Sequence, residues 1–331
     1  MSRALAHVEV IGSVSPIEGK DKIVLAEILG WKVIVQKEFK VGDKVVFVEI
    51  DSVLPEKPEF EFLRSRKFRI KTMKMAGVIS QGIVFSMDFL PQGEYQIGEN
   101  VTEILGVTQY EATMDKDDED ANESGFPNFI SKTDEKRVQA DPSYLKMDCK
   151  WIATEKVDGT SASFTLQRTE NENREYIYDY AVCSRGRRLF AKDNSVYWKV
   201  AEKYNIEEAL YKLIGDNTWV AVQGECIAPG VQKNKYNVKF PDFYAFNLIY
   251  PSGRVGSVEA KKILENVGIK FVPVICDDAP IKGMTVSEVL EYADGKSQIY
   301  DTLREGIVFR SENGTQSFKA VSPKFLMKYD E

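Results

Sequence analysis

The first third of the chain alternates short apolar runs with Gly, Asp and Pro, a pattern typical of β-strands separated by turns. The runs are rich in Val and Ile, and we expect a small β-barrel domain over residues 1–110. The expected strands lie in VEVIGSV at 8–14, KIVLAEILGWKVIV at 22–35, KVVFVEI at 44–50 and GIVFSM at 82–87.

The pattern breaks in the middle of the chain. Residues 113–124 hold six acidic residues against one lysine and almost no apolar side chains, which is the composition of a solvated linker. We therefore predict a linker at 111–125, followed by a second domain at 126–331.

Helix-like and strand-like segments alternate after the linker, so the predicted fold class is α+β, with antiparallel sheets and flanking helices. Residues 193–215 predict one helix that begins at Asp193 or Asn194 and ends at Gly215. Further helices are expected at 257–268 and, after the capping box Thr285 to Glu288, at 289–295, with strands at 269–275 and 306–310.

Composition then limits the chemistry. The 331 residues include one histidine, His7, so one chain cannot form an ordinary Ser-His-Asp triad or a His-rich zinc site. The net charge of −7 gives no overall attraction to nucleic acid, so a surface for a polyanion must be local. The four cysteines lack CxxC spacing, and no apolar stretch approaches 18 residues. We therefore expect an intracellular protein without a membrane span.

One lysine stands in a distinctive setting. Residues 154–160 read TEKVDGT, in which Asp158-Gly159 is a tight-turn dipeptide followed by alternating polar and apolar residues. We expect Lys156 at the end of a strand, just before a hairpin reversal. A lysine near a β-turn is usually an ordinary solvated residue, so this motif decides little by itself.

Five further motifs follow that lysine in order. They are CSRG at 183–186, VAVQGE at 220–225, DFYAFNLI at 242–249, EGIVFR at 305–310 and SFKAVSPKF at 317–325. The series resembles the covalent nucleotidyltransferase superfamily of DNA ligases, RNA ligases and mRNA capping enzymes, whose motifs I, Ia, III, IIIa, IV and V occur in this order. The resemblance covers residues 126–325 and implies an ATP-grasp-like catalytic domain.

The barrel indicates one branch of that superfamily. Only 12 residues follow Lys319, so we expect no barrel module on that side, whereas residues 30–55 resemble an OB-type module. An OB-type module ahead of a minimal transferase resembles one family of ATP-dependent RNA ligases, as do the blocks at 126–139 and 224–235. The resemblance implies an enzyme that seals RNA 3′-OH and 5′-phosphate ends, in RNA or nick repair.

The resemblance also implies residue roles. Lys156 is the implied nucleophile, which attacks the α-phosphate of ATP and carries AMP covalently. Asp158 and Lys319 are the other implied catalytic residues, and Lys319 would touch the α-phosphate. Asp158, Glu225 and Glu305 would hold Mg²⁺ or Mn²⁺ through its waters. The remaining implied nucleotide-binding residues are Glu155, Gly159, Arg185, Phe246 and Lys324.

Several of these roles have plainer alternatives. Arg185 would contact the ribose or the phosphate of the incoming strand, and Phe246 would stack on the base, although aromatic residues in strands more often belong to the core. Many RNA ligases carry Lys-x-Lys in motif V, but Val321 stands at the second position here. We therefore consider Lys324 a weaker candidate than Lys319 for the lysine that contacts the phosphate. The nucleophilic amine must be desolvated or lie near cations to lose its proton.

Residues 64–74 hold six basic and no acidic residues around Phe68, which predicts an RNA-backbone surface on the barrel. The alternative is a solvated loop that happens to be basic. The basic residues are Arg64, Arg66, Lys67, Arg69, Lys71 and Lys74. Lys132, Lys136, Arg137, Lys233 and Lys235 could extend this surface onto the second domain.

Two other classes stay open from the sequence. One is a DNA ligase or a GTP-using capping-type enzyme, and the other is a non-catalytic OB-fold nucleic-acid-binding protein. The sequence also leaves open the RNA substrate, any template requirement and the number of metal ions. We expect a monomer.

Overall fold

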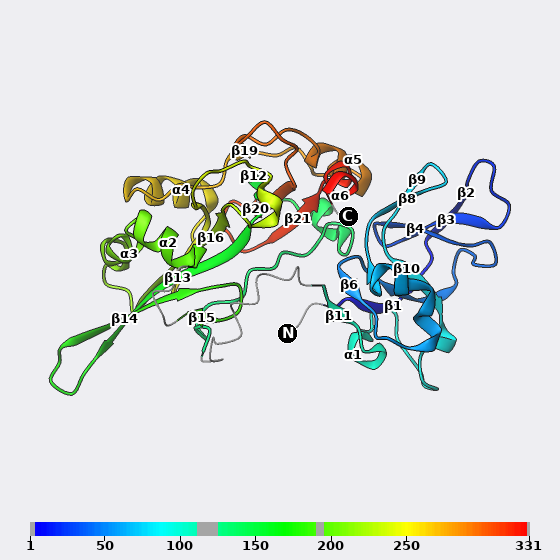
Figure 1. Ribbon diagram of the computed structural model, residues 1–331, viewed down its shortest axis with the longest axis horizontal. Helices are drawn as coiled ribbons and strands as arrows, with labels where there is room; N and C mark the ends of the chain where they lie inside the picture. The colour runs from blue at the N-terminus through cyan, green and yellow to red at the C-terminus, as the bar shows by residue number, and fades with distance from the viewer. Residues whose placement is uncertain (1–3, 111–124, 190–194, 330–331) are drawn as a thin grey trace. The chain divides into compact units, whose positions relative to one another are not determined.

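The computed structural model describes residues 4–110, 125–189 and 195–329 (Figure 1). The chain divides into two compact units, each described here by itself. The first takes its residues from Met1–Thr113, Val138–Tyr144 and Pro323–Glu331, and the second from Met114–Arg137 and Leu145–Ser322. The boundaries predicted from the sequence differ from this division at 138–144 and at the last helix. The predicted acidic linker lies outside the described residues, apart from Gly125.

The first unit is built from short antiparallel strands, and all four predicted apolar runs contain strands. Strand β5 pairs with β1 on one side and β10 on the other. The strands are β1 (Ala6–Val10), β2 (Ser13–Pro16), β3 (Ile23–Ile28), β4 (Trp31–Gln36), β5 (Lys44–Val48), β6 (Ser52–Val53), β7 (Arg69–Ile70), β8 (Met73–Met75), β9 (Val78–Ser80), β10 (Ile83–Ser86) and β11 (Thr108–Gln109). The helices are η1 (Pro58–Arg66), η2 (Met87–Phe89), α1 (Thr102–Leu105) and α6 (Pro323–Tyr329).

His7 lies in the core of this unit, edge-on to the ring of Phe47 at 5.6 Å between centroids. Its Nδ1 is 3.0 Å from the carboxylate of Glu9, and its Nε2 is 3.4 Å from that of Glu49. Burial alone would lower the pKa of His7, but the two buried carboxylates outweigh burial and raise the pKa to about 9. His7 is therefore a structural cation that pairs with two buried carboxylates.

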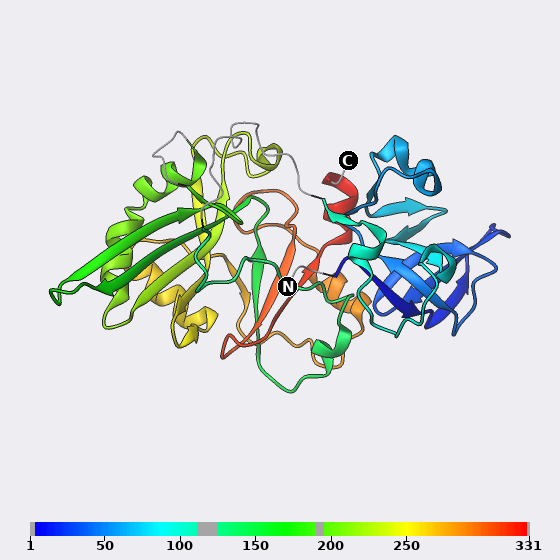
Figure 2. The same cartoon turned by 90° about the horizontal axis from the view of Figure 1, so that it is seen from below.

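The second unit contains two antiparallel sheets, ordered β19-β12-β20-β21 and β15-β14-β13-β16-β17-β18. The paired strands β13 and β14 form a long hairpin that extends beyond the other strands of their sheet (Figures 1 and 2). The strands are β12 (Trp151–Lys156), β13 (Thr160–Glu170), β14 (Tyr176–Cys183), β15 (Arg188–Leu189), β16 (Trp219–Ile227), β17 (Asp242–Tyr250), β18 (Gly253–Arg254), β19 (Val274–Cys276), β20 (Gly306–Ser311) and β21 (Ser317–Val321). The remaining helices are η4 (Pro142–Lys146), α2 (Val196–Lys203), α3 (Ile206–Ile214), η5 (Gln232–Asn234), α4 (Ser257–Asn266) and α5 (Val286–Ala293).

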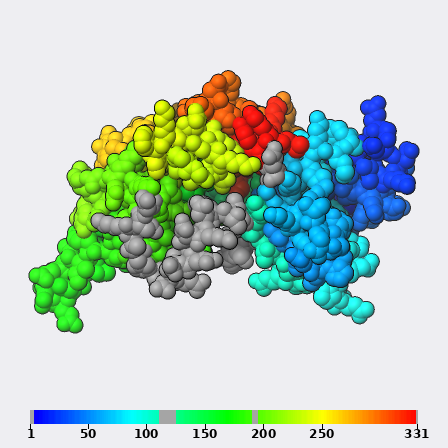
Figure 3. Space-filling view, viewed as in Figure 1, coloured from blue at the N-terminus to red at the C-terminus, as the bar shows by residue number. Residues whose placement is uncertain are grey.

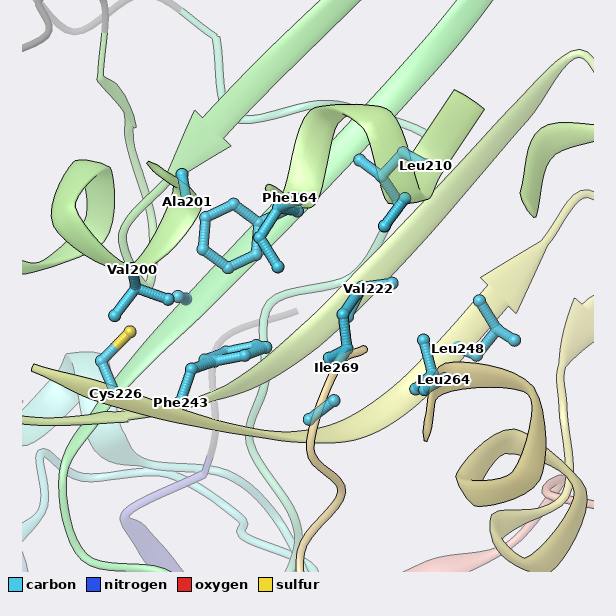
Figure 4. Close-up of a cluster of buried hydrophobic side chains, with 14 of the residues drawn as sticks. Phe164, Val200, Ala201, Leu210, Val222, Cys226, Phe243, Leu248, Leu264 and Ile269 are labelled. Carbon is cyan, nitrogen blue, oxygen red and sulfur yellow. The ribbon is translucent and has the colours of Figure 1, made fainter. Parts of the chain in front are cut away.

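Helices α2, α3 and α4 pack on one face of the six-stranded sheet. Alternate strand residues such as Phe164, Val222 and Phe243 point toward Val200 of α2 and Leu210 of α3 (Figure 4). The opposite face carries buried polar groups, and the Gln223 side-chain amide donates to the Ser163 hydroxyl at 3.2 Å. The apolar face holds the unit together, and the polar face is available for chemistry.

The helix predicted at 193–215 is two helices. Asn205 adopts a left-handed backbone conformation at φ 47°, which ends α2 and starts α3, and Asn tolerates this conformation better than most residues do. The predicted caps Asp193 and Asn194 lie outside the described residues, and the observed cap is Ser195, which accepts from the backbone N–H of Trp198.

The capping box predicted at Thr285 and Glu288 is confirmed. The four cysteines are free thiols. No helix within the described ranges is long and apolar enough to cross a membrane.

Candidate active site

Lys156 ends β12 and is partly buried. Its Nζ donates to the carboxylate of Glu305 at 2.6 Å, and residue 156 lies opposite Gly306 in the β12–β20 register. Burial alone would lower the pKa of Lys156, but Glu305, Glu225 and Asp158 outweigh burial and raise the pKa above its ordinary value. The amine is thus held as an ammonium ion by carboxylates, whereas the sequence led us to expect a site that favours the neutral amine.

The turn after Lys156 is not a hairpin, so that prediction was wrong. Strand β12 pairs with β19 and β20, whereas β13 pairs with β14 and β16 in the other sheet. The turn dipeptide therefore crosses between sheets, because the partners of β12 lie far along the chain, whereas β13 pairs with the next strand, β14, and with β16. A Cβ on Gly159 would lie 2.2 Å from the Cys226 carbonyl oxygen, so only glycine fits this crossing.

Three carboxylates surround Lys156. Glu225 accepts from the Gly159 backbone N–H at 3.1 Å, and burial raises the pKa of Glu225 to about 8. Burial and the Glu305 carboxylate raise the pKa of Asp158 to about 6. Both shifts come first from burial and then from neighbouring carboxylates, so the raised pKa values indicate acids that are removed from water and crowded together.

These carboxylates offer hard oxygen donors, which Mg²⁺ and Mn²⁺ prefer. Among the described residues no three metal-binding side chains cluster closely enough to chelate an ion directly. The donor set fits a hydrated cation, whose waters bridge longer distances than direct ligands do. Asp158, Glu225 and Glu305 are the residues that would hold it.

Two residues that support Asp158 were not recognised from the sequence as part of the site. The Lys235 ammonium binds the Asp158 carboxylate, and its side chain is only 9% exposed. The Tyr236 hydroxyl accepts from the Asp158 backbone N–H at 2.9 Å. Lys235 had been expected on an RNA-facing surface, but the structure places it against Asp158. The only sequence signal was its place in the block at 224–235.

Lys319 lies in β21, opposite Val308 of β20. Its Nζ donates to the Asp134 carboxylate at 2.9 Å, and the other oxygen of Asp134 is 3.8 Å from the Arg185 guanidinium. The segment that carries Asp134 lies beside β21, since the Lys319 backbone N–H donates to the Lys136 carbonyl at 2.8 Å. Asp134 thus brings Lys319 and Arg185 together, a role that its sequence did not reveal.

Glu155 and Phe246 occupy different environments. The Glu155 side chain leaves β12 on the face opposite Lys156 and accepts from the Gln298 backbone N–H at 2.8 Å. Phe246 is half-buried in β17, with the Arg310 guanidinium 5.6 Å from the centre of its ring. Arg310 in turn binds Glu135 at 3.3 Å. The nucleotide-binding roles of Glu155, Phe246 and Gly159 stay predictions.

The predicted basic surface at 64–74 belongs to the first unit and is less uniform than its sequence. Arg64 is paired with Glu61 at 2.5 Å and with Glu56 at 3.3 Å. Phe68 is buried and so unavailable to stack on a base, and Arg69 lies over the Tyr110 ring at 3.7 Å. The nucleic-acid roles of Arg66, Lys67, Lys71 and Lys74 stay predictions.

Lys324 belongs to the first unit rather than to the strand that carries Lys319. It lines a hollow of about 470 Å³ with Lys74, Ile79, Met327 and Lys328. Its predicted role as a second phosphate-binding lysine stays a prediction.

Comparisons with known proteins agree with this architecture. A family model described as an OB-fold domain matches residues 5–87, and one described as RNA ligase matches residues 149–329. A search of curated proteins found no match.

Solved structures of an RNA ligase from Naegleria gruberi align over nearly the whole chain. An apo variant is 30% identical, with a TM-score of 0.88 over 99% of this chain and 98% of that chain. The same ligase with pyrophosphate gives the same identity and TM-score over 99% of both chains. A variant with AMP and Mn gives a TM-score of 0.87 at 30% identity over 99% of both chains. The chain has an N-terminal OB-fold domain and belongs to the RNA ligase family.

Proposed function

We propose that this protein is an ATP-dependent RNA ligase that joins 3′-OH and 5′-phosphate ends through enzyme–AMP and adenylylated RNA. The observation that carries the proposal is the grouping of Lys156 with three carboxylates at the junction of two sheets. Family membership supports the reaction class, and variants of the Naegleria enzyme have been solved with ATP and Mn.

In the first step, the neutral Lys156 amine forms a bond to the α-phosphorus of ATP, and the bond to pyrophosphate breaks. Glu305 lies 2.6 Å from Nζ and is the nearest carboxylate to receive the proton. We assign to Lys319 on β21 the neutralisation of the α-phosphate, as the family resemblance implies. When bound by Asp158, Glu225 and Glu305, Mg²⁺ or Mn²⁺ would supply positive charge for the phosphates and would weaken the attraction of these carboxylates for the Lys156 proton.

In the second step, an RNA 5′-phosphate displaces Lys156 and takes the AMP. In the third step, a 3′-hydroxyl attacks that 5′-phosphate, the RNA is joined and AMP leaves. Arg185 is exposed beside Asp134 and Lys319, where a guanidinium suits the phosphate of the incoming strand.

The reduced cysteines agree with an intracellular protein.

The test is adenylylation with ATP labelled at the α-phosphate. The wild-type protein with Mg²⁺ or Mn²⁺ should take up label, and Lys156→Met should take up none. Lys150→Met is the matched control, because Lys150 is a more exposed lysine directly before the same strand and should leave labelling unchanged. Labelling of Lys156→Met at the wild-type level would refute the assignment of the nucleophile.

The substrate is tested with nicked duplexes that carry ribose or deoxyribose on each side of the nick. We expect sealing where the 3′-OH strand is RNA. Sealing of an all-DNA nick alone would favour a DNA ligase, and RNA binding without any adenylylation would favour a non-catalytic binding protein.

A further inference from the structure

The loop between β16 and β17 has an unusual backbone. Gln232, Lys233, Asn234 and Asn237 adopt left-handed conformations, at φ values of 45°, 56°, 48° and 48°. Such conformations cost non-glycine residues roughly 1 kcal/mol or more each. The loop keeps its shape through its own hydrogen bonds, since the Asn234 side chain bonds both the N–H and the carbonyl of Val238, at 3.0 and 2.9 Å.

The inner side of this loop touches the active site. Lys235 binds the carboxylate of Asp158, and the Tyr236 hydroxyl binds its backbone N–H. Both side chains are largely or fully buried. The loop is therefore fixed to the turn that follows the nucleophilic lysine, and its outer side chains present a surface close to the chemistry.

The outer side of the loop is basic and aromatic. Phe240 is 75% exposed, more than any other large apolar side chain in the described residues, and Lys233 and Lys239 are exposed on the same loop. The yellow-green part of the chain, which includes this loop, reaches the surface in Figure 3. A phenyl ring that is 75% exposed leaves most of its apolar surface in water.

Two more lysines contact the residues that directly follow Phe240. The Lys203 ammonium donates to the Pro241 carbonyl at 2.8 Å, and Lys203 and Lys270 both bind Asp242, at 3.2 and 2.7 Å. Two lysines thus share the Asp242 carboxylate, two residues after Phe240, and Lys233 and Lys239 are exposed on the preceding loop. A net positive surface with an exposed ring has the chemistry of a platform for a nucleic-acid strand.

We propose that Phe240, Lys233 and Lys239 form an RNA-strand platform, on which a base stacks against Phe240 while the two lysines contact the flanking phosphates. The platform rests on the proposed ligase function and adds a surface for the RNA near the nick. Its charge complements a polyanion, and its rigid inner anchors at Lys235 and Tyr236 keep the bound strand in register with Lys156.

The experiment uses the full-length protein and a nicked RNA duplex with 5′-phosphate and 3′-OH ends. Phe240→Ala should weaken RNA binding about tenfold, since stacking on one aromatic ring contributes roughly this much per base. The double change Lys233→Ala and Lys239→Ala should lower the slope of log affinity against log salt by about 1.4 to 1.8, the value for two phosphate contacts. Adenylylation by ATP without RNA should match wild type in both variants.

Matched controls separate this effect from general surface changes. Tyr176→Ala removes another exposed aromatic side chain, and Lys262→Ala removes an exposed lysine of α4; both should bind and seal RNA like wild type. If the Phe240 and lysine variants bind and seal RNA normally, or if only a protein ligand responds to them, the platform is refuted while the ligase function stands. If wild type itself neither adenylylates nor seals, the ligase function is refuted instead.

Discussion

Gly306 offers a direct test of how tightly the active site is built. It lies in β20, opposite Lys156 of β12 and Val321 of β21. A Cβ on Gly306 would lie 2.1 Å from the Ala320 carbonyl oxygen and 2.9 Å from the Val321 Cα. Both atoms belong to the backbone, so no side-chain rotation can relieve the clash in Gly306→Ala.

Ordinary contacts begin near 3.4 Å, so β20 and β21 must separate by more than 1 Å to admit the methyl group. Glu305, which contacts Lys156, directly precedes β20, and Lys319 lies in β21. A displacement of about 1 Å in an active site costs roughly 100-fold in rate, and overpacking of this kind costs about 1–3 kcal/mol of stability. We expect adenylylation by Gly306→Ala to fall about 100-fold while the protein still folds.

The assay is single-turnover formation of enzyme–AMP, with thermal unfolding followed in parallel. Gly93→Ala is the matched control, because its Cβ would meet only the Tyr95 ring, at 3.5 Å, and it should react at the wild-type rate. Folded Gly306→Ala protein that adenylylates within threefold of wild type would show that the spacing of these strands does not govern the chemistry.

Three further predictions follow from the described contacts. Asp134→Asn should slow adenylylation about tenfold by removing the anion that orients Lys319, with a larger effect on kcat than on KM; an unchanged kcat would contradict this role. Lys235→Met should move the acid limb of the pH–rate profile for adenylylation to higher pH. Asp158 loses its buried cation in this variant, so its pKa, already about 6, rises further. An unchanged acid limb would show that Asp158 is not the group whose titration produces it. The His7 pKa is raised from 6.5 to about 9 in the folded protein, so its contribution of about 3 kcal/mol is complete below pH 6.5 and lost as the pH rises through 9. The difference in unfolding free energy between wild type and His7→Gln should therefore shrink between pH 6 and pH 10. A difference that stays constant over this range would refute the stabilising role of the charged His7.

Much of the fold followed from local pattern. The apolar runs of the first unit and the capping box at Thr285 depend on neighbouring residues, so the chain's own sequence locates them. The family resemblance also identified the catalytic domain, because its motifs occur in a fixed order. The left-handed Asn205 that divides one predicted helix carries no periodic signal, and the sequence pattern passed over it.

The features missed by the sequence reasoning arise from contacts between distant residues. The turn at Asp158-Gly159 has hairpin chemistry, but the partners of β12 lie more than 100 residues away, so the turn joins two sheets instead. Asp134 meets Lys319 across 185 residues of sequence, and Lys235 meets Asp158 across 77. Ion pairs of this kind depend on the tertiary fold, and no spacing rule predicts them.

The pairing of β12 with β20 has a consequence for biosynthesis. The six-stranded sheet runs from residue 160 to residue 254 and can form mainly through nearby pairings, which close early at small entropic cost. The sheet that carries Lys156 must wait for β20 and β21, so it stays incomplete until residue 321 has been made. We expect a nascent or truncated chain to contain Lys156, the proposed nucleophile, yet to be unable to consume ATP. We also expect closure of this long loop to be the slow step in folding.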